Sequence, residues 1–195
     1  LYQQRIFTPL GMTSSFLPAR IPENLTVSQG YYTVDNELIN FTDWNTSQGW
    51  AGGGIISTAE DMSVFIRALL NGELFQSVFT LGEMVAFTET GSGSSQYDNY
   101  GLGIAQFANE SLQAWGHGGQ TPGFTSSWVY APQSDTMAVL LTNSGSCTSL
   151  LDLPTSLTPE LFGLTISSTI SSTISSTIAS PATVTTEVEV EADAA

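Results

Sequence analysis

The sequence predicts a mixed fold of the α/β (α+β) class, in which an antiparallel β meander follows a largely helical segment. Short runs of β-branched and aromatic residues alternate with turn residues between Tyr100 and Gly145. Apolar residues recur at helical spacing between Ser57 and Asn71. We therefore divide the chain into three parts: a helical part (1–95), a meander (96–150) and a Ser/Thr-rich, low-complexity acidic tail expected to be disordered (151–195).

The meander is predicted as three or four short strands, which the turn residues place at Gly101–Phe107, Leu112–Gly116, Phe124–Tyr130 and Thr136–Thr142. Clusters of Gly, Pro, Asn and Asp separate these runs, and such clusters are typical of hairpin connections. Short connections make neighbouring strands antiparallel.

One helix is predicted strongly. Ser57 is a plausible N-cap, and Glu60 three residues later completes a capping box. Asn71-Gly72 is a typical helix stop. Weaker patterns predict a second helix over 77–87, the end of a helix over 1–7 that Pro9 and Gly11 stop, and a short extended piece over 31–34.

Composition excludes several classes of function. The 195 residues carry a net charge of −15 with only three Lys and Arg, so binding to a phosphate backbone is excluded. No apolar run is long enough to cross a membrane. A single cysteine, Cys147, and a single histidine rule out a Cys/His metal cluster, and no cofactor is expected.

Two features favour a secreted protein. The first is a set of four Asn-x-Ser/Thr triplets, which are acceptors for surface glycans on the secretory pathway and begin at Asn24, Asn40, Asn45 and Asn109. The second is the Ser-Ser-Thr-Ile unit, which occurs three times over 167–178 and resembles an O-glycosylated stalk. No signal peptide is visible at the start of the sequence, which begins with leucine.

The only histidine, His117, is predicted between the second strand and a turn, and Gly118 and Gly119 follow it. Glycine has no Cβ, so a ligand or another backbone can approach the chain closely there. His117 is therefore a candidate residue for lining a binding site. The alternative is a surface or hydrogen-bonded histidine in a tight turn.

Three stretches resemble, in order and spacing, the C-terminal part of the serine β-lactamase and penicillin-binding-protein family. The class C-like branch, with its esterases and D-aminopeptidases, is the most similar. The stretches are Ile6–Met12 (IFTPLGM), Ala51–Met62 (AGGGIISTAEDM), and Tyr100–Gly103 (YGLG) together with Gly116–Gly119 (GHGG). The resemblance covers roughly residues 1 to 145.

This resemblance implies a β-lactamase/transpeptidase-like fold that is incomplete here, with part of the helical lobe and a three-stranded antiparallel meander. It implies that the last meander strand, Thr136–Thr142, pairs with a strand from the start of the fold. No such strand precedes the helical part in this sequence, so the apolar run Met137–Leu141 is expected to leave an open edge. Residues 1–165 alone are therefore expected to be aggregation-prone or partly molten. Pro154 and Pro159 interrupt the region where the family has a long C-terminal helix.

The family's active site combines Ser-x-x-Lys, Tyr-x-Asn or Ser-x-Asn, and Lys-Thr-Gly or His-x-Gly. Only the last has a counterpart, His117-Gly118-Gly119, since the sequence contains no lysine. Tyr97-Asp98-Asn99 matches the second motif literally, but its position is wrong and Tyr97 is interpreted as loop. The resemblance implies proton transfer or electrostatic support for His117, an open strand edge at Gly119, and an oxyanion-binding N–H at Gln120.

Two functions remain open. The first is a fragment of a β-lactamase-related serine hydrolase whose parent cleaves a small-molecule amide or ester through an acyl-serine, with the given chain expected to be inactive. The second is a non-catalytic, secreted glycoprotein or binding module built on the same fold.

Overall fold

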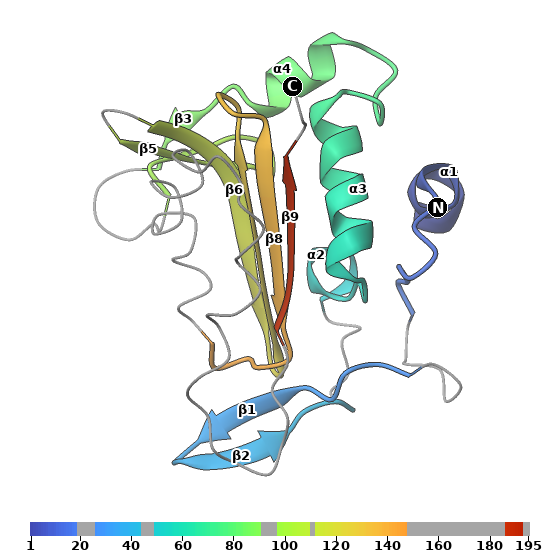
Figure 1. Cartoon of the computed structure of the whole chain (residues 1–195), viewed down its shortest axis with the longest axis vertical. Coiled ribbons are helices and arrows are strands. Elements are labelled where there is room, and N and C mark those ends of the chain that lie inside the picture. Colours follow the sequence, from blue (N-terminus) through green and yellow to red (C-terminus); the bar gives the residue numbers. More distant parts are fainter. Residues whose placement is uncertain (19–25, 44–48, 91–96, 110–111, 148–185, 193–195) are drawn as a thin grey trace.

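The computed structural model describes residues 1–18, 26–43, 49–90, 97–109, 112–147 and 186–192. Within these residues, an antiparallel sheet runs in the order β3-β4-β5-β6-β7-β8-β9, and helix α3 (Ala59–Leu70) packs beside it (Figure 1). The sheet strands are β3 (Thr88–Glu89), β4 (Asn99–Tyr100), β5 (Ala105–Asn109), β6 (Leu112–Thr121), β7 (Phe124–Ala131), β8 (Thr136–Thr142) and β9 (Thr186–Ala192). The predicted α+β meander is confirmed, and the sheet is wider than predicted.

The second meander strand is longer than the sequence predicts. β6 continues through His117, Gly118 and Gly119 as far as Thr121, so His117 lies inside a strand instead of at a turn. The eight-residue β7 supplies a partner along this whole length, and its ladder bonds outweigh the poor strand propensity of glycine. Only Pro122 and Gly123, which has a φ of 102°, form the turn.

The first meander strand begins later than predicted. Residues 101–104 form the connection between β4 and β5, and pairing starts at Ala105. A side chain at Gly101 is excluded there, because its Cβ would lie 2.1 Å from the carbonyl oxygen of Met84. Strand β8 has the predicted bounds, and β7 extends one residue beyond them.

Helix α3 is confirmed, but its cap is one residue later than predicted. Thr58 is the N-cap, and its hydroxyl accepts the backbone N–H of Asp61 at 3.2 Å. Asp61 then holds the N-cap region to the start of the chain, since its Oδ2 accepts the Ser14 N–H and the Ser15 hydroxyl, both at 2.8 Å. Ser57 contributes differently, with its hydroxyl 2.8 Å from that of Ser15.

The sheet carries apolar residues on both faces. On one face, the buried Met137 and Val139 pack with Ala59 and Ile66 of α3. On the other face lies a second buried cluster, formed by Ala105, Phe107, Ala114, Val129, Ala138 and Leu140. Burying a large aliphatic side chain contributes about 1.5–3 kcal/mol, so one cluster holds α3 against the sheet and the other joins β5, β6, β7 and β8.

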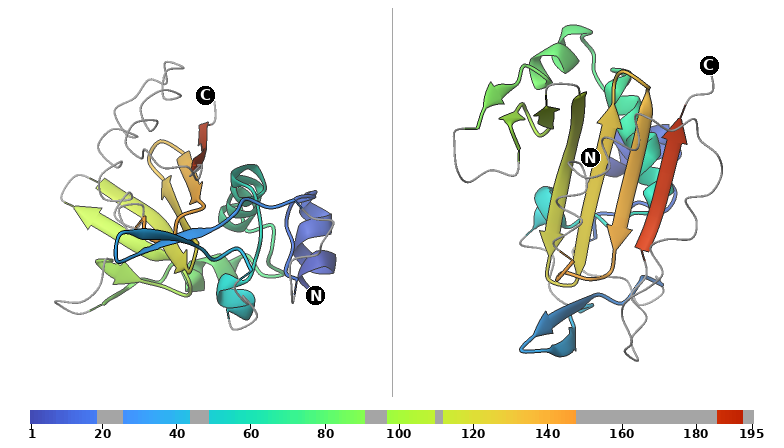
Figure 2. Two further views of the ribbon diagram at one scale, coloured as in Figure 1. Left: turned by 90° about the horizontal axis from the view of Figure 1, so that it is seen from below. Right: turned by 60° about the vertical axis from the view of Figure 1, so that its left-hand side comes forward.

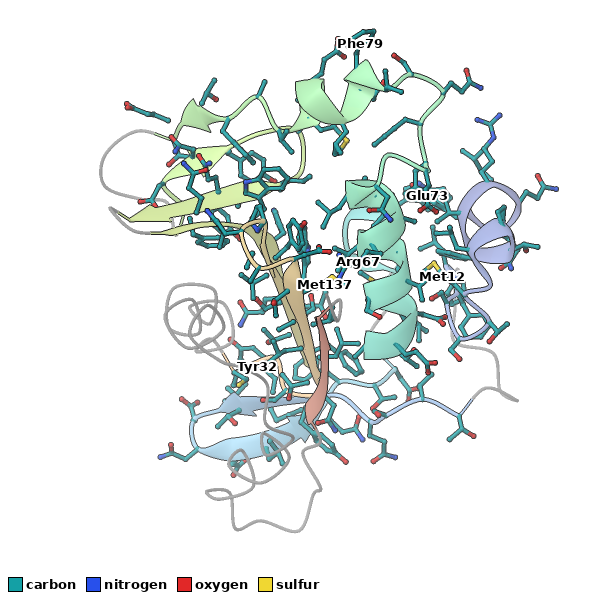
Figure 3. The ribbon with its side chains drawn as sticks, turned by 45° about the horizontal axis from the view of Figure 1, so that its top comes forward. Met12, Tyr32, Arg67, Glu73, Phe79 and Met137 are labelled. Atoms are coloured by element: carbon teal, nitrogen blue, oxygen red, sulfur yellow. The ribbon has the colours of Figure 1, made fainter. Side chains whose placement is uncertain are left out.

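In Figure 3, α3 lies between the sheet and the N-terminal helix. Met137 and Arg67 lie between α3 and the sheet, whereas Met12 lies between α3 and the N-terminal helix. Arg67 forms an ion pair with Asp135, and the Tyr130 hydroxyl donates to the same carboxylate at 3.0 Å. These contacts join the last turn of α3 to the β7–β8 connection.

The N-terminal helix continues past Phe7 and Pro9, and it ends at the predicted Gly11. A π-helical turn, η1 (Gln3–Phe7), passes directly into α1 (Thr8–Leu10), which contains Pro9. Pro9 has no N–H, so the helix makes no backbone hydrogen bond from this position to the preceding turn. The helix ends at Gly11, whose φ is 70°, and the N–H groups of Gly11 and Met12 bond the carbonyls of Thr8 and Phe7.

The described residues of the helical part also form a hairpin and two short helices. The predicted extended piece is β1 (Tyr31–Val34), which forms a hairpin with β2 (Glu37–Asn40), a strand that the sequence analysis missed. Asp35 and Asn36 both have positive φ, as a two-residue hairpin turn requires. A short helix α2 (Trp50–Gly53) was also missed, and the predicted second helix is the shorter α4 (Phe79–Met84).

The sequence predicts a disordered tail over 151–195, but the structure differs at Thr186–Ala192. This segment is β9, which pairs antiparallel with β8 from Thr136↔Ala192 to Thr142↔Thr186. Figure 2 shows it as the outermost strand beside β8. The prediction of an unpaired β8 edge is therefore wrong, because β9 supplies the ladder partner. The Ser-Ser-Thr-Ile repeats, Pro154 and Pro159 lie outside the described residues.

Candidate functional site

The candidate site is the part of β6 that extends beyond its neighbour β5. The β5–β6 ladder runs from Asn109↔Leu112 to Ala105↔Gly116, so in the described sheet no strand pairs with that side of β6 from His117 to Thr121. The other side is fully paired with β7. The sequence that the resemblance associated with an active site therefore lies on an exposed strand edge.

Two tyrosines gather around His117 at this edge. The Tyr100 hydroxyl lies 2.8 Å from Nε2 of His117, and the ring centroids of Tyr97 and His117 are 5.5 Å apart. Nδ1 of His117 lies 2.6 Å from the carbonyl oxygen of Gly118. Both ring nitrogens of the single histidine are thus engaged inside the protein.

The direction of the backbone at Gly118 identifies the groups that face the open edge. The Gly118 N–H donates to the Tyr97 hydroxyl at 3.2 Å, and its carbonyl accepts from His117, so both groups point away from β7. In an antiparallel strand this direction repeats every second residue. The N–H and C=O of Gln120 consequently face the same open edge, where the sequence analysis expected an oxyanion donor.

Gly119 lies on the same face of β6 as the His117 side chain, because side chains alternate along a strand. A Cβ at Gly119 would meet only the hydroxyl of Ser126, at 2.9 Å, within a 4 Å radius. Helix α2 contacts the far end of the edge, with the Cβ position of Gly53 3.6 Å from Thr121.

The side chain of Gln120 has a different role from its backbone. Its Nε2 donates to the carbonyl of Gly145, which anchors β6 to the segment after β8. Burial raises the pKa of Tyr100 above its usual value of 10, and the neighbouring Tyr97 adds to this effect. Tyr100 therefore remains a protonated hydrogen-bond donor at neutral pH.

The structure brings the three predicted site residues together on one strand, and it adds Tyr97 and Tyr100, whose roles the sequence analysis missed. Tyr97 was interpreted as loop, yet its hydroxyl contacts Gly118 and its ring lies against Phe107, with centroids 5.4 Å apart. The literal Tyr-x-Asn match at Tyr97 was a signal that could have found it. No group of three or more His, Cys, Asp or Glu side chains suited to a metal ion occurs in the described ranges.

Two of the predicted glycan acceptors, Asn40 and Asn109, lie in described strands. Asn40 is exposed at the end of β2, and its Oδ1 accepts the N–H of Thr42 at 2.8 Å. Asn109 ends β5, while Asn24 and Asn45 lie outside the described residues. An open hollow of about 490 Å³ adjoins Asn40 and is lined by Gln29 and residues 40–43. None of the helices in the described part of the chain is long and apolar enough to span a bilayer.

Comparison with known proteins identifies a class of enzyme with this architecture. D-amino acid amidase from Ochrobactrum anthropi SV3, complexed with L-phenylalanine amide, matches with a TM-score of 0.65 at 26% identity, over 82% of this chain and 49% of that chain. D-stereospecific amidohydrolase from Streptomyces sp. matches with a TM-score of 0.63 at 26% identity, over 78% and 46%. Penicillin binding protein from Bacillus halodurans shares the fold, with a TM-score of 0.63 at 21% identity, over 76% and 46%.

The Beta-lactamase family model matches residues 1–150, and the chain belongs to this family. It spans about half the length of the solved structures that it resembles. This result confirms the resemblance found in the sequence. The family's Ser-x-x-Lys is absent from this sequence, which contains no lysine.

Proposed function

We propose that this chain is the substrate-binding portion of a serine hydrolase that cleaves small-molecule amides, and that the 195 residues alone have no hydrolase activity. The open β6 edge carries this proposal, because the unpaired Gln120 N–H lies on the same strand as His117. Amide hydrolysis through serine requires a nucleophile, a base and oxyanion donors. This chain supplies one donor and the His117–Tyr100 pair, while the sequence lacks the nucleophile motif.

The choice of amides rests on the two amidohydrolases that match at 26% identity. Acyl transfer places a developing negative charge on the carbonyl oxygen, and a backbone N–H on a strand edge can stabilise it without reorganisation. His117 lies three positions before Gln120 on β6, and the hydroxyl of Tyr100, which contacts His117, offers a polar group to the leaving group.

The test compares the 195 residues with the same residues joined to their preceding coding segment. Each is incubated with D-phenylalanine amide, a p-nitrophenyl ester and a chromogenic β-lactam, and labelled with an active-site serine probe. We expect no turnover from the 195 residues and amide turnover from the joined protein. Turnover by the 195 residues that disappears in His117→Ala contradicts the inactivity. No turnover and no label from the joined protein favours the non-catalytic binding module instead.

Gln120 offers a matched pair of variants in the joined protein. Gln120→Pro removes the N–H on an edge where no ladder bond is lost, and the loss of one oxyanion donor typically lowers kcat about 10²–10³-fold. Gln120→Ala keeps the N–H and removes only the side-chain bond to Gly145, so its kcat should stay near that of the parent. Equal effects in both variants would show that the backbone donor is not used.

A further inference from the structure

The strongest unassigned feature of the described structure is the pair of contacts that engages both nitrogens of His117. A carbonyl oxygen can only accept a hydrogen bond, so the 2.6 Å contact to Gly118 requires the proton on Nδ1. In a neutral ring Nε2 then carries a lone pair, and it can only accept. The hydroxyl of Tyr100, 2.8 Å away, is the donor that this lone pair needs.

We propose that Tyr100 is a positioning residue that holds His117 as the neutral Nδ1–H tautomer at the open edge of β6. The Gly118 carbonyl fixes one side of the ring, and the Tyr100 hydroxyl fixes the other. Neither ring nitrogen is left for a ligand, so His117 acts on a ligand through the Tyr100 oxygen, which keeps an acceptor lone pair.

The surroundings of Tyr100 and His117 agree with the Nδ1–H tautomer. Tyr100 is half-buried in β4, and its pairing with Ala105 fixes its backbone beside the end of β5. Its raised pKa keeps the hydroxyl proton available for donation. Tyr97 differs, since its hydroxyl accepts the N–H of Gly118 and its contact with the histidine is through the rings. Tyr97 therefore supports the strand edge without selecting the tautomer.

The tautomer can be read directly in the full 195-residue chain. Because His117 is the only histidine, a two-bond ¹H–¹⁵N correlation spectrum of the neutral imidazole contains one ring, and its signals need no assignment by mutation. We expect a protonated Nδ1 and an unprotonated Nε2. A dominant Nε2–H tautomer in the unmodified chain would overturn the proposal, and this result does not depend on any variant folding.

Two variants then separate the tyrosines. In Tyr100→Phe the Nε2 resonance should move downfield, toward that of a free lone pair, and an Nε2–H population should become detectable. In Tyr97→Phe both ring nitrogens keep their partners, so the tautomer should be unchanged. Equal changes in both variants, or no change in Tyr100→Phe, would refute the role of Tyr100.

The tautomer predicts an effect on catalysis that rests on the proposed function, whereas the NMR measurement of the tautomer does not rest on it. In the joined protein, Tyr100→Phe should lower kcat more than it raises KM, whereas Tyr97→Phe should have the smaller effect on kcat. If the joined protein has no amidase activity, the proposed function fails while the spectrum still decides the tautomer. If the activity is present and the tautomer is Nε2–H, only the role of Tyr100 fails.

Discussion

Replacing Asp61 by alanine should destabilise the chain far more than replacing its neighbour Glu60. The Asp61 side chain is nearly buried, and its Oδ2 accepts two hydrogen bonds of 2.8 Å, from the Ser14 N–H and the Ser15 hydroxyl. Ser15 is also buried, so without Asp61 its hydroxyl loses a charged acceptor. These bonds join the loop after the N-terminal helix to the first turn of α3.

The magnitude follows from the type of bond. A hydrogen bond to a charged group contributes about 1.5–3 kcal/mol. Taking the lower part of that range for each bond gives about 3–4 kcal/mol for Asp61→Ala. Glu60 is exposed in the same first turn, where an acidic side chain near the helix N-terminus contributes only about 0.3–1 kcal/mol. The two variants remove the same charge from the same helix end, so their difference isolates the buried bonds.

Urea unfolding of the full chain, followed by tryptophan fluorescence and circular dichroism, measures both free energies of unfolding. A double-mutant cycle with Ser15→Ala should give a coupling energy of about 1 kcal/mol or more, since contacting groups are not additive. The reasoning is refuted if Asp61→Ala and Glu60→Ala differ by less than about 0.5 kcal/mol, the error expected of independent sites.

Four further outcomes are expected. Gly116→Ala should lower the free energy of unfolding by about 1–3 kcal/mol, because its Cβ would lie 2.3 Å from the Trp128 carbonyl oxygen. Gly119→Ala should lower it less, since its Cβ meets only the hydroxyl of Ser126. Equal urea midpoints of the two variants would contradict this. The raised pKa values of Tyr100 and Tyr130 favour the protonated phenols in the folded state. Their contribution to the free energy of unfolding is therefore complete below pH 10 and is lost as the pH rises through the folded pKa. A free energy of unfolding that increases above pH 10, in the parent and in Tyr100→Phe, would contradict this expectation. Truncation after residue 185 removes β9 and should expose the β8 edge, giving concentration-dependent association in sedimentation velocity, and a monomeric truncated chain would speak against it. Expression in a eukaryotic secretory host should add a glycan at Asn40 that a peptide N-glycosidase removes, and an unchanged mass in comparison with Asn40→Gln would exclude occupancy there.

The sequence by itself determined the elements whose signals are local. Apolar spacing located α3, and turn residues at both ends located β8 with its observed bounds. Three short motifs in the right order identified the family, which the match over residues 1–150 confirms. It also pointed to His117, Gly119 and Gln120, which do lie together on one strand of the sheet.

The tertiary structure decided features that depend on partners distant in the chain. β6 continues through two glycines because β7 pairs with it, and glycine's own preference predicted a turn. β9 forms because β8 offers an apolar strand without another partner on that side, although its alternating Val and Glu residues also suited a solvated tail. Tyr97 and Tyr100 reach His117 from 20 and 17 positions away in the sequence, through the β4–β5–β6 ladder. Local propensities favour a strand or a turn by less than the hydrogen bonds and burial that a distant partner supplies, so no pattern in neighbouring residues could have placed these groups at one edge.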